Sequence, residues 1–360
     1  ISYRLVGSEM CIRDSDGDST LASLSISSSD SLSGLTGLEG LTGISGSLIL
    51  HSNFYLTDLS ALSGISTLGG DFELVNNGSI QSLAGLEGLT TISGSVLINT
   101  NTVLSSLTGL EGLTGVGESL TIRNNLLLTD ITALSGLTGV NVDLSVSECE
   151  SLSSLEGLHN IGGIGGYLTI EANNNLDDLA GLSGVQTVGE DITIHSNEDL
   201  TALTGLESLL SVGGALIITE NTALLDVDAL TSLEGLGGDL YVYFNNSLED
   251  LSGLSSLQIL NGDLYVKWVP ALVSMDGLEQ LYWIDGSVFV RGNTGLEDLD
   301  ALYGIDWVGG DFEFSYNTAL TNSVANALVD AIGESNIAGE VTIYNLSLIH
   351  ISEPTRRYEI

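Results

Sequence analysis

Aliphatic residues recur along this chain in a fixed order with a period of 24 residues. The first complete unit places leucine or isoleucine at positions 35, 38, 41 and 44, followed by Leu48 and Leu50. The spacing of two is typical of a short strand with Leu48 and Leu50 inward and Ile49 outward. The spacing of three fits neither a strand nor a 3.6-residue helix, and indicates tight turns or short 3₁₀ segments. Each unit is therefore predicted to be one coil of a solenoid.

One polar position keeps the same period. Cys149 and Val269 fill it in two of twelve units, and asparagine fills it in the others: Asn53, Asn77, Asn101, Asn125, Asn173, Asn197, Asn221, Asn245, Asn293 and Asn317. An asparagine amide can satisfy backbone groups at a turn and can bond to its counterparts in neighbouring coils. We therefore expect a structural asparagine ladder. Cys149 is predicted to substitute in it, and Val269-Pro270 is predicted to interrupt it, because proline lacks a backbone donor.

The repeats are predicted to form one domain, residues 32–319, with other segments around it. Residues 320–346 are expected to cap the solenoid with a helix from Thr321 to Ile332 and a strand at 339–343, since Val324, Leu328 and Ile332 recur at helical spacing. Residues 16–31 are rich in serine and aspartate and are predicted to be a flexible linker. Residues 1–15 and 347–360 resemble translated sequencing-adapter read-through and are set aside from fold reasoning.

The charge of the chain excludes some partners. It carries 47 acidic residues against 7 Lys and Arg, for a net charge of −40. With the two ends set aside, Arg123, Lys267 and Arg291 are the remaining cations. Such a field repels nucleic acid and anionic membranes, because binding phosphates requires clustered cations. Neither nucleic-acid binding nor membrane insertion is expected of the repeats.

Aromatic residues gather in the last third of the chain. Thirteen of the eighteen that lie outside the two ends fall between Tyr241 and Tyr316, and Trp283 and Trp307, one period apart, are expected to stack. Such side chains either stabilise a sheet as cross-strand ladders or form a binding patch for a sugar or a protein. The candidate partner-binding residues on outward strand positions and beside them are Tyr241, Tyr243, Tyr265, Lys267, Trp268, Phe289 and Arg291.

Acidic residues suggest two further sites, both less favoured. An aspartate column lies five residues after the asparagine position, at Asp58, Asp130, Asp178, Asp226, Asp250 and Asp298. Local bonds to turn backbone explain it better than a calcium site, because serine or alanine breaks the column repeatedly. Glu171 and His195 form the best candidate catalytic pair, but one acid beside one histidine is expected by chance in so acidic a chain. No catalytic residue, resident metal or cofactor is predicted.

The repeat resembles a known family. The unit from Leu107 to Asn125, LTGLEGLTGVGESLTIRNN, is similar to those of the receptor L-domain, a relative of leucine-rich repeats. The resemblance implies an all-β, right-handed parallel β-helix-like solenoid of about twelve coils, with a short C-terminal helical cap. It also implies ligand binding outside the cell. This chain departs from the receptor members in having no disulfide-bonded ends and no cysteine-rich module.

These observations predict an extracellular or cell-surface, non-enzymatic binding or adhesion protein. Its sheet surface would meet a protein or glycan partner. Two alternatives stay open: a polysaccharide-active β-helix enzyme, and a purely structural acidic component of a surface layer.

Overall fold

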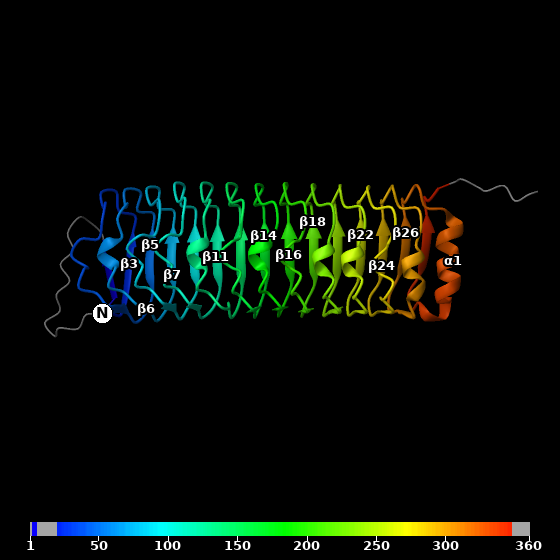
Figure 1. Cartoon of the computed structure of the whole chain (residues 1–360), viewed down its shortest axis with the longest axis horizontal. Helices are drawn as coiled ribbons and strands as arrows, with labels where there is room; N and C mark the ends of the chain where they lie inside the picture. Colours follow the sequence, from blue (N-terminus) through cyan, green and yellow to red (C-terminus); the bar gives the residue numbers. More distant parts are fainter. Residues whose placement is uncertain (1, 6–19, 348–360) are drawn as a thin grey trace, which may run out of the picture.

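The computed structural model describes residues 2–5 and 20–347. Figure 1 shows these residues stacked as successive coils along one axis, from the blue N-terminal end to the red C-terminal end. Three parallel sheets run along the stack, with 15, 5 and 7 strands. This arrangement confirms the predicted parallel solenoid of about twelve coils with a C-terminal helical cap.

The 15-stranded sheet takes one strand from each coil. Its strands, in spatial order, are β1 (Ser2–Leu5), β3 (Ser23–Ser27), β5 (Leu48–His51), β7 (Phe72–Val75), β9 (Val96–Asn99), β11 (Leu120–Arg123), β12 (Leu144–Ser147), β14 (Leu168–Glu171), β16 (Ile192–His195), β18 (Leu216–Thr219), β20 (Leu240–Tyr243), β22 (Leu264–Lys267), β24 (Val288–Arg291), β26 (Phe312–Ser315) and β27 (Val341–Tyr344). From β3 to β26 the paired residues are 24 apart, as in Leu48↔Phe72 and Tyr241↔Tyr265. Residues one period apart are therefore neighbours in space.

Two narrower sheets lie at another face of the stack. The five-stranded sheet contains β2 (Thr20–Leu21), β4 (Gly43–Ile44), β6 (Thr67–Leu68), β8 (Thr91–Ile92) and β10 (Gly115–Val116). The seven-stranded sheet contains β13 (Gly163–Ile164), β15 (Thr187–Val188), β17 (Ser211–Val212), β19 (Gly235–Leu236), β21 (Ile259–Leu260), β23 (Trp283–Ile284) and β25 (Trp307–Val308). The two are separated at one coil, where Val140 makes isolated bridges to both sides.

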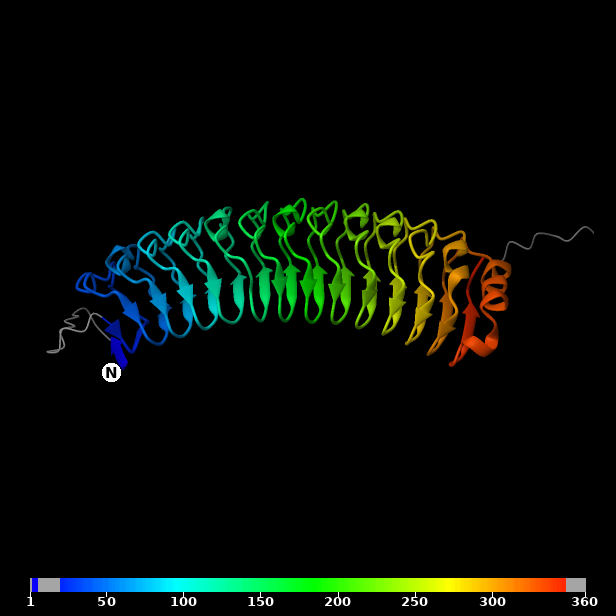
Figure 2. The same cartoon turned by 60° about the horizontal axis from the view of Figure 1, so that its bottom comes forward.

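Short 3₁₀ helices occur in about half of the coils. They are η1 (Ser60–Leu62), η2 (Thr132–Leu134), η3 (Ala180–Leu182), η4 (Asp228–Leu230), η5 (Ser252–Leu254) and η6 (Asp300–Gly304), and η7 (Glu334–Asn336) follows in the cap. Figure 2 shows the stack bent into a shallow arc, with the strand arrows towards the concave side and these coiled turns on the convex side. The 15-stranded sheet is thus the inner surface of the arc.

The hydrophobic core is the interior of the stack. Strand residues alternate as predicted, so that Leu48 and Leu50 are fully buried while Ile49 and His51 face outward. The aliphatic positions spaced by three, such as Leu35, are buried as well. Because each coil repeats the same inward set, one continuous core runs along the chain.

A column of left-handed residues forms one corner of the coils. The residue before the ladder position has a positive φ in each, although it is seldom glycine: Ser28, Ser52, Asn76, Thr100, Asn124, Glu148, Ala172, Ser196, Glu220, Phe244, Trp268, Tyr316 and Asn345, together with Gly292. Positive φ is uncommon for residues other than glycine. This corner sets the direction in which the chain leaves the strand. We call it the left-handed column.

The asparagine side chains form a buried ladder of hydrogen bonds. The backbone N–H of Asn77 donates to Oδ1 of Asn101 at 3.0 Å, and Nδ2 of Asn101 donates to the Leu74 carbonyl at 2.9 Å. Nδ2 of Asn77 also reaches Oδ1 of Asn101 at 3.3 Å. Each amide therefore satisfies backbone groups of the preceding coils, which would otherwise be buried without partners.

The ladder changes at the two positions that lack asparagine. The Cys149 and Val269 backbone N–H groups still donate to the next asparagine, at 3.1 and 2.9 Å. The Cys149 thiol lies 3.4 Å from the Ser147 carbonyl and is a weak replacement for an amide. Val269 has no polar side-chain atom to offer Asn245, so the amide chain is broken there.

Helix α1 (Asn322–Ile332) covers the C-terminal end of the stack. The Thr321 hydroxyl accepts a hydrogen bond from the Val324 N–H at 3.3 Å, which makes Thr321 the N-cap. Ala325, Leu328 and Ile332 are buried against the last coil. Among the described residues, no helix is long and apolar enough to cross a membrane.

The N-terminal side differs from the prediction. Residues 20–27 were assigned to a linker, but Leu24 and Ile26 are buried in β3, which pairs with β5. That part of the linker prediction is wrong, because these two residues stand one period before Leu48 and Leu50 and complete a further coil. Residues 16–19 lie outside the described residues.

The adapter resemblance of both ends remains a prediction. At the N-terminus, residues 2–5 form β1 and pair with β3. Residues 1, 6–15 and 348–360 lie outside the described residues.

Candidate binding surface

Strands β20, β22 and β24 and the turns after them bring aromatic and cationic side chains together on the inner sheet. We define the aromatic–cationic surface as Tyr241, Tyr243, Phe244, Tyr265, Lys267, Trp268, Phe289, Arg291 and Tyr316. It consists of two aromatic columns with a row of cations between them. The period of 24 residues builds it, because each column repeats one position of the coil in successive coils.

The first aromatic column stands on the outward position of the strands. The Tyr241 and Tyr265 rings are stacked with centroids 4.7 Å apart and an interplanar angle of 6°. The Tyr265 and Phe289 rings follow at 4.9 Å and 9°. Because the ring faces cover one another, the column presents mainly ring edges to the solvent.

Carboxylates hold the phenols of this column in place. The Tyr241 hydroxyl donates to Oδ2 of Asp239, and the Tyr265 hydroxyl donates to Oδ2 of Asp263, both at 2.5 Å. Oδ1 of Asp239 accepts the Asp263 N–H at 2.7 Å, which fixes the carboxylate to the next coil. Burial and these carboxylates raise the pKa of both tyrosines above the ordinary value. The rings are therefore rigidly positioned before any partner arrives.

Lys267 lies among the rings. Its Nζ is 4.4 Å from the centre of Tyr265, 4.9 Å from Phe289 and 5.4 Å from Tyr243. Such cation–π contacts stabilise an ammonium group by about 0.5–2 kcal/mol. Burial among the rings nevertheless lowers the pKa of Lys267, although the charges of Glu313 and Asp263 act in the opposite direction.

The second aromatic column belongs to the left-handed column. The Phe244 and Trp268 rings are stacked at 4.8 Å and 3°, and Tyr316 stands two coils further on. These three side chains are 41, 41 and 43% exposed, so that they form a contiguous exposed aromatic patch together with Arg291. Gly292 occupies the coil between Trp268 and Tyr316.

Arg291 lies between the rings of Trp268 and Tyr316. Its Cζ lies 5.9 Å from the ring centre of Trp268 and 4.9 Å from that of Tyr316. A Cβ atom at residue 292 would be 2.7 Å from Cδ1 of Trp268, so a side chain there would displace the indole. Glycine at this position therefore leaves room for the Trp268 indole where it lies.

Neither cation of this surface is neutralised by an acid. In the part of the chain that the structure describes, ion-pair contacts join Arg123 to Glu148, His51 to Glu73 and His159 to Glu156. Lys267 and Arg291 make cation–π contacts instead. Of the three Lys and Arg side chains that the structure describes, Arg123 alone has a carboxylate partner, although the chain has a net charge of −40.

The seven residues predicted from the sequence lie together on this surface, which also includes two residues that were not predicted. Phe244 and Tyr316 belong to the column of Trp268, one period before it and two periods after it. Their spacing from Trp268, in multiples of 24 residues, was the feature of the sequence that could have identified them. Trp283 and Trp307 stack at 5.8 Å and 26° in the seven-stranded sheet, on another face as expected.

The aspartate column has a structural role at the start of the 3₁₀ turns. Each aspartate accepts a hydrogen bond from the N–H two residues later, as Asp58 does from Ser60 at 2.8 Å and Asp130 from Thr132 at 2.9 Å. The same bond occurs in the others: Asp178, Asp226, Asp250 and Asp298. Among the described residues, no group of three or more His, Cys, Asp or Glu side chains could hold a metal ion.

Coils that lack this aspartate have a different kind of turn. They have a glycine with positive φ three residues after the column position, at Gly37, Gly85, Gly109, Gly157, Gly205 and Gly277. In most of them a glutamate two residues later accepts the glycine N–H, as Glu111 does from Gly109 at 2.8 Å. Both kinds of coil therefore use a carboxylate for local backbone bonds.

The other candidate chemistry is not assembled for catalysis. Glu171 and His195 are in register on β14 and β16, but Nδ1 of His195 lies 2.8 Å from Oγ1 of Thr219 and its Nε2 lies 3.1 Å from Oγ of Ser196. Burial raises the pKa of the Cys149 thiol to about 11, so it is a poor nucleophile at neutral pH.

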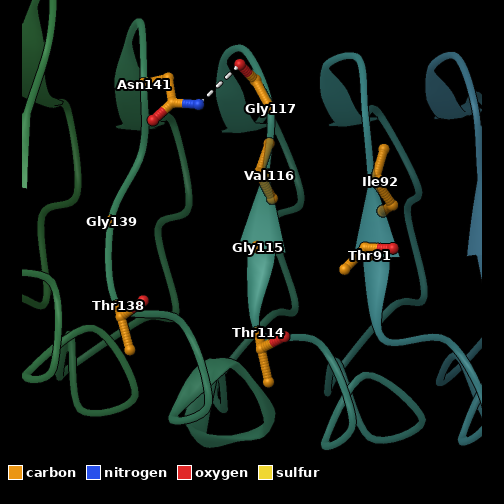
Figure 3. A pocket seen from close by; sticks show the side chains of 9 residues that line it. All are labelled: Thr91, Ile92, Thr114, Gly115, Val116, Gly117, Thr138, Gly139 and Asn141. Carbon is orange, nitrogen blue, oxygen red and sulfur yellow. Dashed lines mark hydrogen bonds between the residues drawn. The ribbon is translucent and has the colours of Figure 1, made fainter.

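Shallow hollows lie on the surface, and one of about 430 Å³ is lined by residues 234–237, 258, 259 and 261 at β19 and β21. Two others are smaller. The first, of about 350 Å³, opens where the two narrow sheets are separated, and Asn141 Nδ2 bonds to the Gly117 carbonyl at 3.1 Å beside it (Figure 3). Its lining is small and carries no titratable side chain. The second, of about 320 Å³, adjoins the second aromatic column and is lined by Ser196, Glu198, Glu220, Thr222, Phe244 and Asn246.

Comparisons with known proteins find distant similarity only. No family model matches the chain, and no curated protein sequence matches it. Among solved structures, an internalin (inlF) from Listeria monocytogenes is 17% identical, with 90% of this chain and 82% of that chain covered and a TM-score of 0.34. The TLR13–ssRNA13 complex matches at 17% identity, with 87% and 57% covered and a TM-score of 0.21.

Proposed function

We propose that this protein binds a protein or glycan partner through the aromatic–cationic surface, outside the cell or at its surface, without catalysing a reaction. The observation that carries this proposal is the pair of unneutralised cations, Lys267 and Arg291, set between rigid aromatic columns in a strongly acidic chain. Structural stability alone does not require such an arrangement, because burial disfavours the charged form of Lys267.

The position and composition of this surface support a binding role. It lies on the 15-stranded sheet at the inner side of the arc (Figure 2), where side chains of successive coils form one continuous surface. Tyrosine, tryptophan and arginine are the residues that most often dominate binding energy in protein interfaces. Exposed aromatic residues with a polar rim also mark ligand-binding sites.

The test replaces two stacked rings and compares binding with a matched pair elsewhere. We expect Tyr265→Ser with Phe289→Ser to abolish binding on a glycan array or in a pull-down from cell-surface extract, while unfolding shifts only slightly. Trp283→Ser with Trp307→Ser removes a stacked pair from another face and should leave binding intact. If both double variants bind as the wild type does, the stack is structural and the proposal is wrong. Cleavage of a bound glycan would support the enzyme alternative.

A further inference from the structure

Arg123 and Arg291 occupy the same position in two different coils. Each ends a four-residue strand, β11 or β24, and each side chain reaches the left-handed residue of the next coil. For Arg123 that residue is Glu148, and Nη2 lies 2.5 Å from Oε1. For Arg291 it is Tyr316, whose ring centre lies 4.9 Å from Cζ. The equivalent arginines therefore make the same contact with different partners: Arg123 contacts an acid and Arg291 contacts an aromatic ring.

This difference leaves the hydrogen-bonding capacity of Arg291 unused. Arg123 is neutralised by Glu148, to which both Nε and Nη2 donate. Arg291 lies between two rings, and no described carboxylate is within ion-pair distance of it. A guanidinium group has five N–H donors in a planar fork that matches a carboxylate or a sulfate. Arg291 is therefore positioned as a receptor for such an anion.

The surroundings of Arg291 favour the same ligand chemistry. Lys267 is its register partner on β22, so two positive charges stand side by side. Like charges directly opposite each other destabilise a sheet unless something compensates them. Glu313, the acid with the largest effect on Lys267, is occupied by the Ser315 hydroxyl at 2.5 Å.

We propose that this surface binds an acidic glycan, with a carboxylate or sulfate group of one sugar held by Arg291 and Lys267. This inference rests on the proposed binding function and specifies its ligand class. The charge of the chain argues against a densely acidic protein segment. Beyond about 10 Å from the two cations such a segment would meet the repulsion of the remaining acidic surface, screened only in part by salt. A glycan can place neutral sugars there.

The hollow beside Phe244 fits the neutral part of such a ligand. One face of Phe244 is covered by Trp268, and the hollow lies against the residue on the side of the preceding coils. Ser196, Thr222 and Asn246 supply hydroxyl and amide groups in its lining. A flat aromatic ring beside such groups suits a sugar ring, which combines an apolar face with hydroxyls at its rim.

The test titrates the full chain with three defined oligosaccharides by calorimetry. They are a neutral galacto-oligosaccharide that carries one terminal galacturonate, its carboxyl-reduced neutral counterpart and the same galacto-oligosaccharide carrying one sulfate group. We expect at least one acidic oligosaccharide to bind and the neutral one to bind much more weakly. Arg291→Gln should raise Kd about tenfold or more, because it removes hydrogen bonds between charged groups. Arg123→Gln is the matched control and should leave Kd unchanged.

A second variant keeps Arg291 but neutralises it. Tyr316→Glu places at residue 316 the side chain that occupies the equivalent position at Glu148, where the backbone has nearly the same φ, 54° against 58°. We expect Tyr316→Glu to remove acidic-glycan binding without loss of thermal stability. Equal losses in Arg123→Gln and Arg291→Gln would contradict the proposal, since the effect would then be one of total charge.

The outcomes separate this inference from the proposed function. If neutral and acidic oligosaccharides bind equally, and binding depends on Tyr265 and Phe289, the binding surface stands and the acidic-ligand inference is wrong. If a polyglutamate peptide binds through Arg291 and no oligosaccharide binds, the inference of an acidic glycan is wrong and the ligand is an acidic protein segment. If neither binds and the double ring variant changes nothing in the pull-down, both are wrong.

Discussion

Trp268 packs so closely over Gly292 that a Cβ atom at residue 292 would lie 2.7 Å from Cδ1 of the indole. Among the described residues of the left-handed column, Gly292 is the one glycine. Its missing side chain leaves room for the indole, and the Arg291 guanidinium lies 5.9 Å from the centre of that ring. The architecture of the aromatic–cationic surface therefore depends on a residue that contributes no side chain to it.

Gly292→Ala should disturb this surface more than it disturbs the fold. The alanine must adopt a φ of +72° and push the Trp268 ring away, at a cost of about 1 kcal/mol in the free energy of unfolding. We expect a shift in tryptophan fluorescence and weaker partner binding. Gly115→Ala is the control, because a Cβ there meets nothing within 4 Å. An unchanged fluorescence spectrum in Gly292→Ala would show that the indole is not held as described.

Removing one ladder amide should destabilise the whole stack. Asn101→Ala leaves the Asn77 N–H buried without its acceptor, and a group of this kind costs about 1–3 kcal/mol. We expect the midpoint of urea unfolding to fall markedly, and exchange of the Asn77 amide hydrogen to accelerate. Cys149→Asn is the converse variant and should raise the midpoint, because it gives Asn125 an acceptor. A midpoint for Asn101→Ala equal to that of the wild type would contradict the ladder's role.

The aspartate column should matter for turns and not for calcium. Asp130→Ala removes the acceptor of the Thr132 N–H and hydroxyl, at 2.9 and 2.6 Å, and should cost about 1 kcal/mol. Asp130→Asn keeps an acceptor oxygen and should cost less. These hydrogen bonds lower the pKa of Asp130, so its contribution is present above the ordinary aspartate pKa and is lost as pH falls through the lowered value. Calorimetry with calcium chloride should register no binding heat; a saturable heat lost in Asp130→Ala would overturn this assignment.

The tyrosines of the first aromatic column should stabilise the protein at moderately alkaline pH. Their pKa values are raised on folding, so their contribution is complete below about pH 10, the unfolded value, and is lost as pH rises through the folded value. We expect Tyr265→Phe to flatten the decline in stability above that pH, measured by thermal unfolding across a pH series. Tyr55→Phe, at an exposed tyrosine, is the control and should leave the decline unchanged.

The period of the sequence predicts the facing of most side chains, because strict register places residues 24 apart beside each other. For that reason Tyr241, Tyr265 and Phe289 could be aligned without a structure, and the spacing of Val324, Leu328 and Ile332 identified the capping helix. Residues 20–27 belong to the solenoid, contrary to the prediction, which gave more weight to amino-acid composition than to the 24-residue period. Serine-rich sequence suggested a linker, although Leu24 and Ile26 were in phase with the core.

The left-handed column could not be predicted in the same way. A bulky residue such as Trp268 or Tyr316 disfavours positive φ, so its local preference points away from the conformation that the stack imposes. The aromatic partners of Lys267 and Arg291 could not be predicted from the sequence either. Lys267 contacts the first column and Arg291 the second.

The ladder positions that hold a residue other than asparagine are evenly spaced. Ser29, Cys149 and Val269 each occupy the ladder position and donate a backbone N–H to the asparagine of the next coil. They lie 120 residues apart, which is five coils, and glycine-type turns follow all three. These three positions therefore recur every five coils, a length that we call a block, although the turn types do not all follow it, since the glycine turn at Gly109 corresponds to the aspartate turn at Asp226.

Block equivalence supplies an internal reference for the binding surface. The residues one block before Tyr265, Lys267, Phe289 and Arg291 are Ser145, Ser147, Thr169 and Glu171. Those residues stand on the same inner sheet, in strands of the same length and register. One block therefore presents hydroxyls and an acid where its successor presents rings and cations, so that nearly the same scaffold carries two opposite surface chemistries within a single molecule.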